Sequence, residues 1–149
     1  MIEEWHYWKP PQKLEPGYGV DIISCEEDNF SIELYATGPK DSYIKLDFQG
    51  NAQAYRYTNE SFALQTLCNI LNKYGPDFYP QWSFFTVTKS TYLSAYEHDT
   101  NTTVSSLIHF AIIGEDEIVD VITTKAPIVT FIDIEPLTHS ESNVNSIES

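Results

Sequence analysis

Apolar and polar side chains alternate with a period of two along much of the chain between residues 20 and 58. The run 30–36 ("FSIELYA") places Ile and Leu side chains on one side and polar ones on the other, and 42–48 ("SYIKLDF") repeats the pattern. The flanking segments 20–26 and 52–58 contain β-branched and aromatic residues, and turn-forming residues separate the four segments. This pattern predicts an antiparallel meander with one face exposed to solvent.

The period changes to that of a helix after Thr58. Thr58 or Asn59 supplies a side-chain oxygen for the N-cap, Gly75 suits the position after the last turn, and Pro76 prevents continuation. We therefore predict one long helix near 60–74 that packs on one face of the sheet. Its apolar stripe comprises Phe62, Leu67, Ile70, Leu71 and Tyr74.

Between this helix and the last third of the chain the pattern is mixed. Residues 81–89 ("QWSFFTVTK") favour a strand. Residues 90–99 ("STYLSAYEHD") favour a short helix capped by Ser90, although a strand remains an alternative.

The last third predicts three strands, at 104–114, 117–124 and 127–135. They are apolar on both faces in places, so we expect them in the middle of a sheet. Three prolines make residues 1–19 an extended arm, and residues 138–149 are polar and without periodicity, as in a tail. The whole pattern predicts a single α+β domain over 1–149, with a mainly antiparallel sheet of six to eight strands.

The charge of the chain is strongly negative and narrows the classes of partner. The formal net charge is −14, there are 8 lysines and arginines, and Arg56 is the sole arginine. Residues 90–149 contain one base, Lys125, against 10 acids. A nucleic-acid-binding protein needs a basic stripe, and an anionic membrane attracts basic segments. We therefore expect neither partner, and consider either simple solubility or attraction to a basic protein.

The remaining composition suggests an intracellular protein. Residues 1–20 contain no secretory signal, and no stretch of eighteen apolar residues is present, so we expect a cytoplasmic location. The two cysteines, Cys25 and Cys68, have no CxxC spacing, and we interpret both as buried free thiols. No metal site and no cofactor is expected, because the four histidines are scattered and no Gly-rich phosphate loop is present.

Three consecutive acids, Glu115, Asp116 and Glu117, lie between two apolar runs in "IIGEDEIVDVI". Burying an unpaired carboxylate is costly, so we expect all three to face water or a cationic partner at a hairpin tip. A solvated turn and a docking surface for a basic protein are both open. We add the nearby Asp120 to the candidate partner-binding residues.

The same hairpin register places Ala111 opposite Asp120 and His109 opposite Ile122, so that Asp120 becomes a diagonal neighbour of His109. A His–Asp contact is half of a hydrolytic triad. The chain contains no GxSxG, so we favour a structural histidine and predict no catalytic residues. Hydrolysis that uses His109 or His98 is the weakest of the functions considered.

Aromatic residues cluster in "YRY" and "FYPQW", which include Tyr55, Tyr57 and Trp82. Core packing explains such residues, but aromatic side chains surrounded by acids also serve as anchors at protein interfaces. We include these three side chains in the candidate partner-binding surface.

In its small size, its acidity and the hairpin "HFAIIGEDEIVDVITTKAPIV", the chain resembles bacterial immunity proteins, the cytoplasmic antidotes of protein toxins. The resemblance is one of general character and identifies no particular family. It implies an inhibitor that covers a basic toxin, such as a nuclease, with an acidic and aromatic surface.

The alternative function is a small-ligand-binding or regulatory α+β domain without catalysis. Its pocket would be lined by Tyr55, Tyr57, Trp82 and Phe84.

Overall fold

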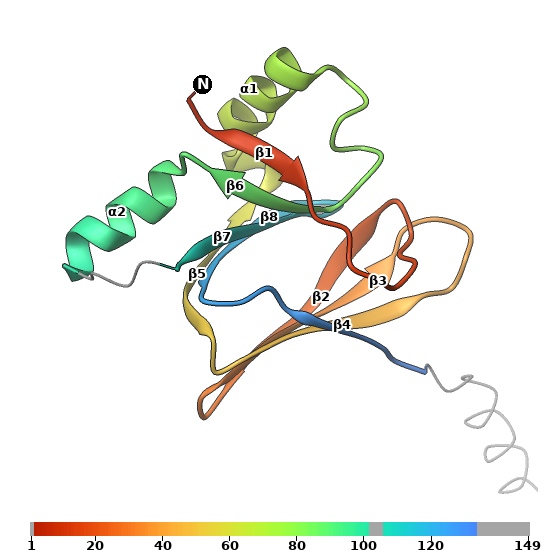
Figure 1. Ribbon diagram of the computed structural model, residues 1–149. Coiled ribbons are helices and arrows are strands. Elements are labelled where there is room, and N and C mark those ends of the chain that lie inside the picture. The colour runs from red at the N-terminus through yellow and green to blue at the C-terminus, as the bar shows by residue number, and fades with distance from the viewer. Residues whose placement is uncertain (1, 102–105, 134–149) are drawn as a thin grey trace, which may run out of the picture.

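The computed structural model describes residues 2–101 and 106–133 (Figure 1). Within them the fold is α+β and its strands pair antiparallel, as predicted. Nine strands form two sheets rather than one, which exceeds the predicted six to eight. The predicted tail at 138–149 lies outside the described residues.

The five-stranded sheet has the order β1-β6-β7-β8-β5. It joins the first strand of the chain to a central hairpin, β7–β8, and ends at β5. Its strands are β1 (Glu4–Tyr7), β6 (Phe84–Thr88), β7 (Ile108–Ile113), β8 (Glu117–Thr123) and β5 (Ala52–Asn59).

The four-stranded sheet has the order β2-β3-β4-β9. The predicted meander is confirmed for its first three strands, but the fourth alternating segment, β5, crosses to the other sheet. β9 is an edge strand, so the prediction that all three C-terminal strands lie in mid-sheet is wrong for this one. The strands are β2 (Tyr18–Glu26), β3 (Asn29–Ala36), β4 (Tyr43–Gln49) and β9 (Ile128–Phe131).

The two sheets pack face to face around one apolar cluster. Alternate residues of β3, β4, β7 and β8 point into it, which explains the period of two in these strands. The four-stranded sheet contributes Phe30, Ile32, Leu34, Ile44, Leu46, Phe48 and Val129, and the five-stranded sheet contributes Phe84, Phe110, Ile112, Val119 and Val121.

The helix α1 (Leu64–Tyr74) covers the opposite face of the five-stranded sheet (Figure 1). Leu67 and Ile70 are its buried residues, and they share a second apolar cluster with Trp5. Gly75 ends the helix at φ +94°, a left-handed conformation that glycine adopts without strain.

The predicted helix at 60–74 is divided in two, because its first residues form a separate 3₁₀ turn, η1 (Glu60–Phe62). The Asn59 side chain caps this turn by accepting from Ser61 N at 3.1 Å. Phe62 consequently points away from the α1 stripe and is 86% exposed.

The second helix, α2 (Thr91–Thr100), confirms the prediction of a helix capped by Ser90. It contains no buried residue and projects beside the β6–β7 side of the five-stranded sheet (Figure 1). Among residues 2–101 and 106–133, the polar and cation–π contacts of α2 with the body come from Ser90, Thr91 and Tyr92 at its start, so these side chains determine where α2 lies.

Both cysteines were predicted to be buried, and both are exposed. Cys25 lies at the second-last position of β2, opposite Phe30 of β3. Cys68 lies on the outer side of α1, one position from the buried Leu67. A short apolar run in the sequence does not show which of its side chains are covered when the run lies at the end of a strand or at the edge of a helix's apolar face.

Candidate functional site around Ser90, His109 and Asp120

The centre of the site is a contact between neighbouring central strands. Ala111 on β7 pairs with Asp120 on β8, and His109 pairs with Ile122. The predicted register is therefore confirmed, and the diagonal pair meets: His109 Nε2 and Asp120 Oδ1 are 2.6 Å apart. The exposed fractions of the two residues are 1% and 3%.

Arg56 extends this pair toward the edge of the sheet. It lies opposite Asp120 in the β5–β8 register, and its Nε donates to Asp120 Oδ2 at 2.8 Å. Its guanidinium carbon stands 4.1 Å from the centre of the Tyr92 ring on α2, a cation–π contact. The Arg56 side chain is half exposed and the Asp120 side chain is 4% exposed, so the pair joins the interior to the surface.

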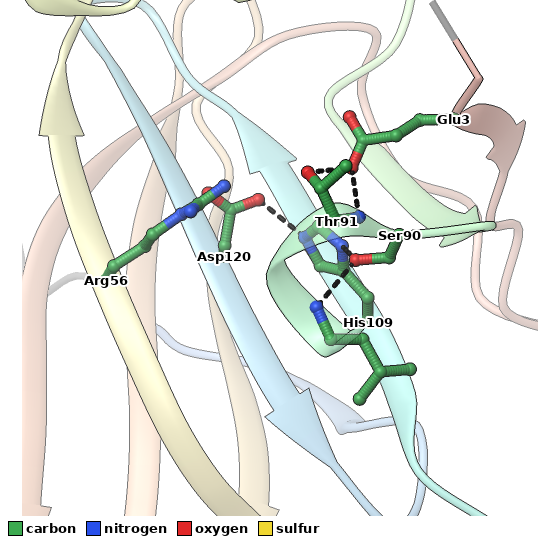
Figure 2. A network of polar contacts seen from close by, with 7 residues as sticks. Glu3, Arg56, Ser90, Thr91, His109 and Asp120 are labelled. Carbon is green, nitrogen blue, oxygen red and sulfur yellow. Dashed lines mark hydrogen bonds and ion pairs between the residues drawn. The ribbon is translucent and has the colours of Figure 1, made fainter. Parts of the chain in front are cut away.

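Ser90 completes the cluster from the other side (Figure 2). Its Oγ is 2.6 Å from His109 Nδ1, and it also accepts from Leu93 N at 2.9 Å as the N-cap of α2. Nε2–H donates to the Asp120 carboxylate, whereas the direction of the hydrogen bond between Nδ1 and the Ser90 hydroxyl depends on the protonation of the ring. In either form the hydrogen bonds connect the α2 backbone to the carboxylate through Ser90 and His109.

The charge of this cluster is fixed by its surroundings. Burial raises the pKa of Asp120, but the hydrogen bond and charge of His109, with the charge and hydrogen bond of Arg56, outweigh burial and lower this pKa overall. Asp120 consequently remains a carboxylate that holds both partners.

The order Ser–His–Asp is that of a hydrolytic triad, but the setting differs from an active site. Ser90 is 4% exposed and its Oγ is committed to the helix cap. The neighbouring amide, Thr91 N, which could serve an oxyanion, donates to Glu3 Oε2 at 2.9 Å. The geometry favours a buried hydrogen-bond relay that fixes the first turn of α2 to the sheet.

The three predicted acids at the β7–β8 tip are divided by the structure. Glu115 and Asp116 are exposed, and Glu115 Oε2 accepts from the Tyr35 hydroxyl at 3.2 Å. Glu117 is 5% exposed, which contradicts the prediction that it faces water. It folds inward because its Oε1 accepts from Val20 N at 2.9 Å and its Oε2 from Asp116 N at 2.6 Å, so backbone amides replace water.

Two other predicted partner-binding residues are also internal. Asp120 is buried in the relay described above. Trp82 is partly buried, and its Nε1 donates to the Trp8 carbonyl at 3.0 Å, so its indole holds the N-terminal arm. Tyr55 and Tyr57, by contrast, are 45% and 51% exposed on β5, as an interface would require.

The sequence did not identify the most exposed apolar side chains near the acids. Phe62 is 86% exposed and Leu64 is 58% exposed. A hollow of about 470 Å³ lies beside Leu64, and its other lining residues are Asn59, Glu60, Ser61 and Asp116. The Glu60 amide donates to the Asp116 carbonyl at 2.8 Å, which joins η1 to the β7–β8 tip.

Comparisons with known proteins leave the site without a family context. No family model, no curated protein and no solved structure matches this chain. Within residues 2–101 and 106–133, no group of three or more His, Cys, Asp or Glu side chains could hold a metal ion. The same residues include no helix long and apolar enough to cross a membrane.

Proposed function

We propose that this protein is a non-catalytic inhibitor that binds a basic protein through an acidic end patch, defined as Glu60, Phe62, Leu64, Glu115 and Asp116. The observation that carries the proposal is the 58% exposure of Leu64 in a hollow that it lines together with Glu60 and the exposed Asp116, with the 86% exposed Phe62 two positions away in the chain. Protein interfaces often combine a large exposed apolar side chain, which serves as an anchor, with a surrounding rim of charged groups. Here the charged groups are carboxylates.

The acidic end patch provides both electrostatic attraction and apolar contact area, which such binding needs. Glu60, Glu115 and Asp116 attract a cationic surface over the range of a Debye length, about 8–10 Å in physiological salt. The net charge of −14 adds a long-range field of the same sign, which raises the rate of encounter with a basic protein. Phe62 and Leu64 then exclude water and slow dissociation.

The partner that fits this chemistry is a cationic toxin, such as a nuclease whose Lys and Arg side chains bind phosphates. Carboxylates of the acidic end patch would take the places of those phosphates and cover the toxin's substrate-binding face. The resemblance to immunity proteins in size and acidity supports this assignment.

The direct test is co-expression with the product of the adjacent gene, followed by co-purification. The double variant Phe62→Ser and Leu64→Ser should lose the complex, whereas the matched variant Ile128→Ser should retain it, because Ile128 is 53% exposed on the other sheet. Co-purification that is unaffected by the double variant would remove the patch from the proposal.

A second candidate function, small-ligand binding, is favoured by a hollow of about 760 Å³ at the open end of the sandwich. Phe30 and Tyr55 give it an apolar wall, and Cys25, Glu27 and Asp28 lie at it. Of the residues predicted to line a pocket, Tyr55 lines this one, whereas Phe84 is fully buried in the core.

A further inference from the structure

A smaller cavity of about 260 Å³ lies beside the Ser90–His109–Asp120 relay, between β5, η1, α1 and the N-terminal strand. Taking about 30 Å³ per water molecule, it has the volume of roughly nine waters. It is slightly smaller than the pockets of drug-sized ligands, which begin near about 300 Å³. Its lining includes Glu3, Trp5, Arg56, Thr58, Phe62, Ala63, Thr66, Thr91, His109, Ile118 and Asp120.

Trp5 provides the first sign that this cavity takes a ligand. The residue is 4% exposed, and its Nε1 has no hydrogen-bond partner among the described residues. Buried indole N–H groups are normally paired, because leaving such a donor unpaired costs free energy. The partly buried indole of Trp82 follows the rule, since its Nε1 donates to the Trp8 carbonyl. Because Trp5 Nε1 is itself buried, an acceptor on a molecule in the cavity would pair it after a small shift of the side chains that cover it.

The cavity also carries one cation and one anion that retain binding capacity. Arg56 pairs with Asp120 through Nε, which leaves its two terminal nitrogens as donors. Glu3 accepts from Thr91 N and Oγ1 through Oε2, which leaves Oε1 as an acceptor. Figure 2 shows Arg56 and Glu3 on opposite sides of the relay.

The remaining walls are of two kinds. Thr58 and Thr66 add hydroxyl groups, whereas Ala63 and Ile118 are apolar and nearly fully buried. Two acids line the cavity, Glu3 and Asp120. The Asp120 carboxylate is already paired with Arg56 and His109, so Glu3 is the acid that remains for a ligand. A complementary molecule therefore has a carboxylate for Arg56 and Trp5, an ammonium group for Glu3, and a small apolar body.

We propose that this cavity is a binding site for a free α-amino acid with an apolar side chain. The carboxylate of the ligand accepts from the Arg56 terminal nitrogens and from Trp5 Nε1, and its ammonium group donates to Glu3. Because Glu3 also holds the first turn of α2, the bound amino acid would stabilise the attachment of that helix. This site is independent of the acidic end patch except for Phe62, which is left unchanged in the test.

The test uses leucine and two matched compounds, 4-methylpentanoate, which lacks the amine, and 3-methylbutylamine, which lacks the carboxylate. The chain has three tryptophans, so a ¹H–¹⁵N spectrum of the whole protein contains three indole signals, and the variant Trp5→Phe assigns one of them. Leucine should shift the Trp5 signal to saturation and leave the Trp82 signal in place. Each matched compound should bind at least tenfold more weakly.

Calorimetry on variants gives the second measurement. Trp5→Phe removes one hydrogen bond to the ligand carboxylate and should weaken leucine binding at least tenfold. Glu3→Gln retains an oxygen for Thr91 but removes the charge, and should weaken it at least tenfold. Trp82→Phe is the control for loss of an indole N–H elsewhere, and should bind leucine as the wild type does.

Three results would overturn the proposal. One is a Trp5 signal that leucine does not move at its solubility limit, which would assign the indole to water. Another is equal binding of 4-methylpentanoate and leucine, which would make the cavity a carboxylate site. The third is unchanged affinity in Glu3→Gln, which would place the ligand elsewhere.

Discussion

His109 Nε2 lies 2.6 Å from Asp120 Oδ1 across the two central strands of the five-stranded sheet, and both side chains are buried. This contact connects an edge-strand cation, Arg56, to the cap of a helix that buries no residue of its own. The position of α2 therefore depends on a polar relay rather than on apolar packing.

Replacing Asp120 by Asn should destabilise the protein by about 2–3 kcal/mol. Removing one partner of a buried ion pair costs about 3–5 kcal/mol, and the half exposure of Arg56 reduces this value through solvent screening. Urea unfolding measures the change. Asp116→Asn, at an exposed position, should stay within about 0.5 kcal/mol of the wild type, and equal effects of the two variants would contradict the account.

The lowered pKa of Asp120 gives a signed prediction for acid stability. A carboxyl whose pKa is lower in the folded state contributes stability above its unfolded pKa of about 3.9, and that stability is lost as the pH falls through the folded value. Unfolding free energies measured at decreasing pH should therefore fall below about pH 4, and fall less steeply in Asp120→Asn. Parallel curves for the two proteins would refute the assignment.

Ser90→Ala should loosen α2 while the sheet stays intact. The substitution removes the N-cap oxygen, which costs about 1–2 kcal/mol, and leaves His109 Nδ1 without its hydrogen-bond partner. Amide hydrogen exchange should accelerate in the first turn of α2 but not in β7 or β8. Ser94→Ala, on the exposed side of the same helix, is the control and should not change exchange.

The exposed thiols provide a test of the second candidate function. Both Cys25 and Cys68 should react with a thiol reagent in the folded state, because both are exposed. Cys25 lines the 760 Å³ hollow and Cys68 does not, so a ligand of that hollow should slow only the Cys25 reaction. A compound that protects both thiols equally would bind elsewhere or act on global unfolding.

Local patterns in the sequence predicted the elements that local physics determines. The period-two alternation of the β7–β8 hairpin correctly predicted that His109 and Asp120 are diagonal neighbours. The residues around Gly75 correctly predicted where α1 ends. The division into two sheets could not be predicted, because strands of either sheet show the same alternation. β5 could therefore not be separated from the meander that precedes it.

The candidate site was harder to predict, because its partners are far apart in the chain. Glu117 was expected in water, and its burial depends on the amide of Val20, 97 positions away in the sequence. Ser90 was recognised as a helix cap, but its contact with His109 depends on where α2 begins relative to β7. Phe62 was assigned to a buried helical stripe, since the separate turn η1 leaves no clear signal.

The central claim is that the acidic end patch meets a basic protein, and the most direct measurement is the association rate constant at low and high salt. Glu60→Gln with Glu115→Gln and Asp116→Asn should slow association with the co-purified partner and flatten its salt dependence. Glu97→Gln with Asp99→Asn, on α2, should change both far less. Equal rates and equal salt slopes in all three proteins would contradict the account.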